Sequence, residues 1–190
     1  MDVPPAPRPT FALPAGGDVD LVLREPWTAA PLTRLVEDDL ELLRAWEPWA
    51  AEEPTPAGTA AYGRSQLLAW VDGRAVPTVV RERGVVVGAV GARLDPAVGT
   101  ADLGWWLASS AQGRGVATRA VAALADHLVA AHGVRRLQAR VAVGNTRSLA
   151  LAARLGLRPE GVLLGALAVG GRRLDVEVHG LDAAGWRGRP

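Results

Sequence analysis

The stretch from Asp102 to Ala131 changes its pattern of hydrophobic and polar positions twice. Asp102–Leu107 is a short aromatic and aliphatic run, which predicts a strand. Ser109–Gly115 consists mainly of small and polar residues and contains two glycines, which predicts a loop. After the loop, apolar residues recur about every four positions, which predicts an amphipathic helix. These recurring positions are Val116, Ala120, Leu124 and Leu128.

The rest of the chain alternates between helical and strand patterns around this stretch. Strand patterns cover residues 19–24, 75–81, 85–93, 99–107, 134–143, 162–167 and 174–181. Helical patterns cover residues 28–47, 59–71 and 146–155. A meander, a strand–helix–strand crossover and a closing hairpin together predict one α/β domain over residues 19–181. Residues 1–18 are rich in proline and predict a flexible arm, and residues 182–190 are expected to form a tail.

A strand that leads through a glycine loop into a helix produces a site for an anion. The first backbone N–H groups of a helix have no partner within the helix, and the helix dipole adds partial positive charge. Gly113 and Gly115 let the backbone approach a ligand without a Cβ in the way. The loop lacks the Gly-Lys-Ser/Thr ending of a P-loop, and Thr118 stands at the third glycine position of the dinucleotide fingerprint. We therefore expect a phosphate-bearing ligand of another kind.

Composition excludes several classes of protein. The 21 basic and 20 acidic residues leave a net charge of +1, without the basic excess of a dedicated nucleic-acid binder. The chain has no cysteine, which excludes disulfides, thiolate metal sites and a cysteine nucleophile. The histidines lack metal-binding spacing, so no metal site is expected. No membrane-spanning run or signal peptide is visible, and a cytoplasmic location is expected.

The loop reads Q-G-R-G-V-A at residues 112–117 and fits the pattern Gln/Arg-x-x-Gly-x-Gly/Ala. In this pattern the sequence resembles the GNAT superfamily of N-acetyltransferases. L-G-W-W-L before the loop, G-N-T-R-S-L-A-L-A-A-R-L-G-L-R-P-E-G after it and L-R-A-W-E-P-W at Leu43–Trp49 are similar to the Rim-type protein N-terminal acetyltransferases. The likeness runs from about Val19 to Leu181. It implies a mixed, mostly antiparallel sheet of six or seven strands with splayed middle strands, flanked by helices.

The resemblance also implies acetyl-CoA as the co-substrate, with its pyrophosphate on the loop amides and its pantetheine beside the strand that ends at Leu107. The residues it assigns to the coenzyme are Trp105, Trp106, Leu107, Gln112, Gly113, Arg114, Gly115, Val116, Ala117, Thr118, Asn145 and Ser148. Arg114 is a phosphate partner or a solvated loop arginine, and Arg119 and Arg147 are weaker candidates. Asn145 is also suited to cap a helix, a role compatible with ligand binding.

The catalytic assignments depend on the same resemblance. Ser148 matches the subgroup's serine that donates a proton to the leaving thiolate. The subgroup's glutamate base falls on Leu167, which cannot take a proton. Asp102 is our candidate base, because burial beside tryptophans would raise its affinity for a proton. An aspartate with an ordinary structural role in a strand would show the same sequence pattern. Other candidates are Glu160, Glu177, His179 or a water chain.

The acceptor is expected to be a primary amine, either a protein N-terminus or a small molecule, that attacks the thioester directly. Trp46, Trp49 and Trp70 could form an aromatic wall around this amine, or could simply fill the core. A transferase for succinyl-CoA or another acyl-CoA, and a degenerate module that only binds CoA, remain alternatives. Family members are often dimers, and an apolar helix face could support a homodimer.

Overall fold

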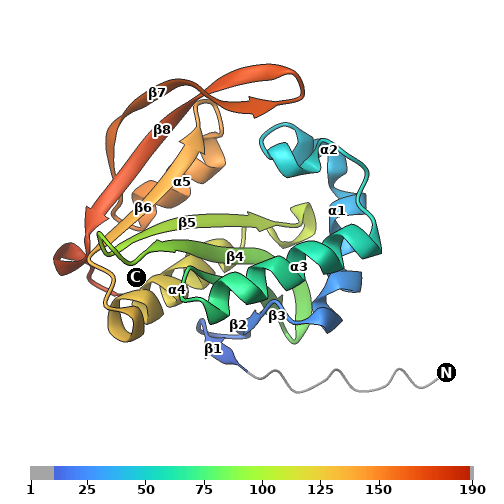
Figure 1. Ribbon diagram of the computed structural model, residues 1–190, viewed down its shortest axis with the longest axis horizontal. Coiled ribbons are helices and arrows are strands. Elements are labelled where there is room, and N and C mark those ends of the chain that lie inside the picture. Colours follow the sequence, from blue (N-terminus) through green and yellow to red (C-terminus); the bar gives the residue numbers. More distant parts are fainter. Residues whose placement is uncertain (1–10, 189–190) are drawn as a thin grey trace.

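A computed structural model of the chain describes residues 11–188, which form one mixed sheet with helices on both faces (Figure 1). The strands are β1 (Ala12–Pro14), β2 (Val19–Leu23), β3 (Ala75–Glu82), β4 (Val85–Asp95), β5 (Thr100–Leu107), β6 (Arg136–Ala142), β7 (Arg158–Val169) and β8 (Arg172–Asp182). The helices are α1 (Ala29–Asp38), α2 (Leu40–Arg44), α3 (Pro56–Val71), α4 (Val116–His132) and α5 (Thr146–Arg154). Short 3-10 turns are η1 (Pro26–Thr28), η2 (Pro48–Ala50), η3 (Ser109–Ala111) and η4 (Ala183–Gly185).

The eight strands are ordered β1-β2-β3-β4-β5-β6-β8-β7. Among the described strands, β5 and β6 are the one parallel pair, joined by the α4 crossover that the sequence predicts. The two strands pair from Thr100–Leu103 with Arg136–Ala139 and then separate. β5 continues to Leu107 on β4, and β6 continues to Ala142 on β8, so the sheet opens into a V between them (Figure 1).

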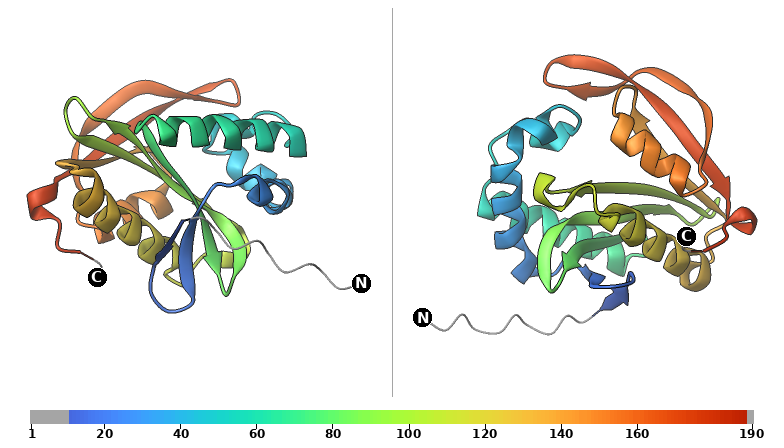
Figure 2. Two further views of the ribbon diagram at one scale, coloured as in Figure 1. Left: turned by 60° about the horizontal axis from the view of Figure 1, so that its bottom comes forward. Right: turned by 180° about the vertical axis from the view of Figure 1, so that it is seen from behind.

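The helices lie in two layers. Figure 2 shows α4 and α5 on one face of the sheet and α1 and α3 on the other. α4 buries Leu124 and Leu128 completely, in the cluster that also holds Leu103 of β5. On the opposite face, Leu32 of α1 lies in a cluster with Val79 of β3. Both layers pack on the strands that lead to the V, so they fix its position.

Three features depart from the sequence prediction. An eighth strand forms because Ala12–Pro14, which the prediction gave to a flexible arm, pairs with β2 at the sheet edge. The expected tail is also ordered near its start, since Trp186 Nε1 donates to Asp126 Oδ1 over 2.8 Å. Residues 1–10 of the predicted arm lie outside the described residues. The predicted helix over 28–47 breaks at Asp39, whose carboxylate accepts a hydrogen bond from Ser109 N at 2.7 Å.

Candidate active site

The N-terminus of α4 is open to a ligand. Gly113 and Gly115 have positive φ angles of 80° and 73°, a conformation that favours glycine, and no side chain caps the helix. Within residues 11–188, none of the backbone N–H groups from Gly113 to Thr118 donates to another protein group. Unpaired amides at the positive end of a helix are suited to bind an anion, which is the ligand that the sequence leads us to expect here.

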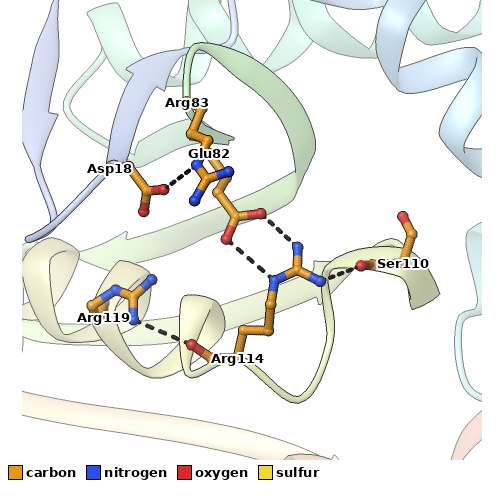
Figure 3. Close-up of polar contacts among 6 residues, drawn as sticks. All are labelled: Asp18, Glu82, Arg83, Ser110, Arg114 and Arg119. Atoms are coloured by element: carbon orange, nitrogen blue, oxygen red, sulfur yellow. Dashed lines mark hydrogen bonds and ion pairs between the residues drawn. The ribbon is translucent and has the colours of Figure 1, made fainter.

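Side chains around the loop hold it in this shape. Figure 3 shows the Arg114 guanidinium directed at Glu82 of β3 and at the Ser110 carbonyl, while Arg119 donates to the Arg114 carbonyl. The Arg114 guanidinium also lowers the pKa of Glu82. Because Arg114 is committed to these partners, the structure favours a role in shaping the loop over the predicted direct contact with phosphate.

Hydrogen bonds also connect the loop to β5 and to α5, which lie on the two sides of the V. The Gln112 side chain donates to the Leu107 carbonyl at the end of β5, over 3.0 Å, and accepts from Arg147 of α5 at 2.8 Å. At the start of α5, Asn145 Oδ1 accepts from Ser148 N at 3.2 Å, so Asn145 is the helix cap that its residue type suggests. These bonds position the anion site next to the ends of β5 and β6.

A cleft of about 910 Å³ occupies the V and extends across the sheet beneath α3. Its lining includes Trp105, Trp106 and Asp102 of β5, and Asn145 and Ser148 at the start of α5. Leucine side chains of β7, at positions 163 and 167, line the opposite wall. The structure thus brings the predicted serine and most of the predicted aromatic residues into one cleft.

Two of the three tryptophans predicted at the acceptor site line this cleft. Trp46 and Trp49 are lining residues, and the Trp49 ring lies 5.9 Å from that of Trp106. Gly144 has no Cβ, and the Trp46 ring occupies the space 3.6 Å from where that atom would be. Trp70 is a correction: it is not a lining residue, and its side chain packs against the main core, where a large apolar ring gains most from burial.

The candidate base Asp102 is paired with two arginines. Its carboxylate lines the cleft, but Oδ2 accepts from Arg93 at 2.9 Å and from Arg140 at 3.0 Å. Both guanidinium groups hold this oxygen in ion pairs, so the carboxylate is not free to face an acceptor amine. The sequence missed this pairing because Arg140 reaches Asp102 only through the parallel β5–β6 register.

Glu47 is the carboxylate that sequence reasoning missed. It lines the cleft between Trp46 and Trp49, and its Oε2 accepts from Trp49 Nε1 at 2.8 Å. Burial raises the pKa of Glu47, and the hydrogen bond from Trp49 offsets this only in part. Among the described residues no arginine or histidine pairs with it. The signal was present in the W-E-P-W motif, which places a carboxylate between two tryptophans.

The other predicted candidates for a base lie elsewhere. Leu167, at the position of the subgroup's glutamate, lines the cleft as an apolar wall. Glu160 is paired with Arg136, which lowers the pKa of Glu160, and neither lines the cleft. Glu177 Oε2 lies 3.0 Å from Nε2 of the buried His179, also away from the cleft.

Over residues 11–188, no group of three or more His, Asp or Glu side chains is arranged to hold a metal ion. None of the helices described in this range has the length and apolar character needed to cross a membrane.

Comparison with known proteins gives consistent matches. Residues 20–158 match the acetyltransferase (GNAT) domain family. YdaF of Bacillus subtilis (strain 168), provisionally named a ribosomal N-acetyltransferase, is 26% identical over 94% of this chain and 98% of its own. The structure of Mycobacterium smegmatis RimJ in complex with CoA-disulfide has a TM-score of 0.83 and 31% identity, covering 92% of this chain and 87% of RimJ. RimL, a ribosomal L7/L12 α-N-protein acetyltransferase in complex with coenzyme A, has a TM-score of 0.88 and 22% identity, covering 90% of this chain and 98% of RimL.

The open helix end predicts opposite effects of one substitution on stability and on ligand affinity. In Thr118→Asp, a carboxylate in the first turn of α4 should stabilise the free protein by about 0.3–1 kcal/mol. The same charge should weaken binding of coenzyme A roughly tenfold or more, because it repels the diphosphate. Isothermal titration and thermal unfolding measure both effects. Thr118→Asn is the neutral control of the same shape, and equal affinities of the two variants would contradict the assignment.

Proposed function

The chain belongs to the acetyltransferase (GNAT) domain family and is an acetyl-CoA-dependent N-acetyltransferase, and we propose that its acceptor is the α-amino group of a protein N-terminus. The observation that carries this proposal is the cleft, which continues from the V across the sheet and has room for an extended peptide. The names of YdaF and RimL, which refer to ribosomal and N-terminal acetylation, support the same acceptor class. A chain end is narrow enough to enter such a cleft, whereas a folded surface is not.

The coenzyme site follows from the unpaired backbone groups. The diphosphate accepts hydrogen bonds from the amides between Gly113 and Thr118 at the start of α4. The pantetheine runs along β5 beyond Leu103, where the strand has lost β6 as a partner and can pair with an added chain. This path brings the thioester into the V beside Ser148, which lines the cleft.

Glu47 takes the role that the sequence gave to Asp102. An acceptor ammonium must lose a proton before its nitrogen lone pair can attack, and Glu47 is the half-buried cleft carboxylate without a cationic partner among the described residues. Burial raises the pKa of Glu47, which suits a proton acceptor, whereas Asp102 is held by two arginines. The neutral amine then attacks the thioester carbonyl carbon directly, without an acyl-enzyme.

Ser148 acts at the other end of the reaction. As the carbon–sulfur bond breaks, the attacking nitrogen releases its second proton to solvent and the thiolate takes a proton from the Ser148 hydroxyl, which regains one from solvent. The Asn145 cap fixes the turn that presents this hydroxyl. Trp46 packs against the same turn at Gly144, so the acceptor wall and the serine are held together.

The alternatives raised by the sequence lose their motivation in this arrangement. A degenerate coenzyme-binding module was suggested by the missing base at Leu167, and Glu47 supplies a base from another element. A donor with an extra carboxylate, such as succinyl-CoA, would need an available arginine in the V. Arg93 and Arg140 lie there, but both already form ion pairs with Asp102.

The acceptor assignment predicts which amine of a peptide is modified. Peptides with a free N-terminus and one internal lysine should be acetylated at the α-amino group, with release of one thiol per acetyl group. Mass spectrometry locates the acetyl group, and a thiol reagent measures turnover. Peptides with a blocked N-terminus are the control. Exclusive lysine acetylation, or turnover only with small-molecule amines, would contradict the proposal.

The base assignment predicts the pH dependence of Glu47→Gln. A base acts in its ionised form, so kcat/KM of the wild type rises through the pKa of Glu47, which lies above the usual glutamate range. In the variant this pH-dependent rise should be absent, and kcat/KM should be roughly 10²–10⁴-fold lower than in the wild type. Without this base only the free amine reacts, so kcat/KM of the variant should instead rise through the pKa of the acceptor α-amine, about 7.7–8.0.

Coenzyme affinity, measured by titration, should be unchanged in Glu47→Gln, because Glu47 belongs to the acceptor wall. Glu41→Gln removes an exposed carboxylate of α2 and serves as the matched control. The base is not Glu47 if the variant retains the wild-type pH profile.

A further inference from the structure

Arg24 is a cation without a counter-charge at the far end of the cleft. It follows β2, lines the cleft and is half-buried. Its Nε is fully buried and has no hydrogen-bond partner, and within residues 11–188 its guanidinium makes no ion pair. The guanidinium group stacks on the Tyr62 ring, with Cζ 4.7 Å from the ring centre.

The absence of a counter-charge is unfavourable for the protein alone. Burial lowers the pKa of Arg24, yet a guanidinium stays protonated in proteins, so a partly desolvated positive charge remains. Stacking on an aromatic ring stabilises such a charge only modestly. The other two arginines in the cleft, Arg93 and Arg140, have Asp102 as their partner. Arg24 is therefore the cleft arginine that remains available for an anion.

Glycine and proline residues line the cleft between Arg24 and the V. Strand register aligns Gly104 of β5 with Gly91 of β4 and Gly91 with Pro77 of β3, and Arg24 N donates to the Pro77 carbonyl at 3.0 Å. All four residues line the cleft. The two glycines leave room above the sheet for a chain. One face of α3 covers this path with Gly58, Thr59, Tyr62 and Gln66.

The length of this path sets the position of the anion. Three strand spacings separate β2 from β5, which is about 14 Å. An extended peptide advances about 3.3 Å per residue, so this distance spans roughly four residues. The arginine side chain can reach back toward the V, which shortens the required length.

We infer that Arg24 binds a carboxylate of the acceptor, carried by an acidic residue at the third, fourth or fifth position from the acetylated amine. This inference rests on the proposed function, because it takes the acceptor to be a peptide that enters the V with its N-terminus. A planar guanidinium suits a carboxylate, with which it forms two parallel hydrogen bonds. Arg24 then selects among N-termini by charge, while Glu47 acts on the amine itself.

The test compares peptides that differ at one position. Each pair carries Asp or Asn at position three, four or five, and kcat/KM is measured at saturating acetyl-CoA. The wild type should prefer the Asp peptide roughly tenfold at one of these positions. Arg24→Gln should remove the preference, and Arg24→Lys should retain part of it because it keeps the charge. Arg64→Gln, an exposed arginine of α3 outside the cleft, should behave as wild type.

The outcomes separate this inference from the proposed function. If the wild type acetylates peptides without an Asp preference, or if Arg24→Gln keeps the preference, the inference is wrong and the proposed function stands. If no peptide is acetylated, the proposed function fails, and the anion subsite is tested by titrating glutarate and inorganic phosphate into the CoA-saturated protein. Loss of binding in Arg24→Gln but not in Arg24→Lys would support the subsite, and equal binding in all variants would overturn it.

Discussion

In the proposed mechanism, coenzyme binding depends on a row of backbone N–H groups that have no protein partner within residues 11–188. The turn at Gly113 and Gly115 ends β5 and starts α4 without a capping side chain, so the amides up to Thr118 can be satisfied by a ligand or by water. The surrounding side chains keep these amides open instead of filling the site. Arg114 is held by Glu82, and Gln112 bridges the end of β5 to α5. A diphosphate placed here determines where the rest of the coenzyme can lie, and the divergence of β5 and β6 provides that space.

The charges of the cleft divide into paired and unpaired groups. Asp102 is paired with both Arg93 and Arg140 at its floor, and Glu53 is paired with Arg44 at 2.8 Å on its rim. Glu47 and Arg24 are both half-buried and have no ionic partner among the described residues. Charged groups that are partly buried and unpaired destabilise the free protein. Such groups are therefore often found at functional sites. In our account, Glu47 acts on the amine and Arg24 on an anion further along the acceptor.

Local features of the sequence predicted most of the fold. The period of the apolar residues predicted α4, the glycines predicted the loop that leaves its N-terminus open, and the spacing around both predicted the parallel crossover. Features that depend on contacts between distant segments were missed. The edge strand β1 forms only because β2 offers a free edge, and the arginines around Asp102 come from two neighbouring strands. The role of Trp70 could not be decided from residue type, because a core tryptophan and a cleft tryptophan look the same in a sequence. The importance of Glu47 likewise appears only when its burial and lack of a partner are known.

The most direct test of the central claim follows the backbone amides themselves. Amide NMR spectra of the protein should be recorded during separate titrations with coenzyme A and with pantetheine, which lacks the diphosphate. The account predicts that the signals of Gly113, Gly115 and Thr118 move strongly with coenzyme A and little with pantetheine, whereas signals of β5 beyond Leu103 respond to both. If the loop amides respond equally to the two ligands, or to neither, the diphosphate does not bind at the start of α4 and the account is wrong.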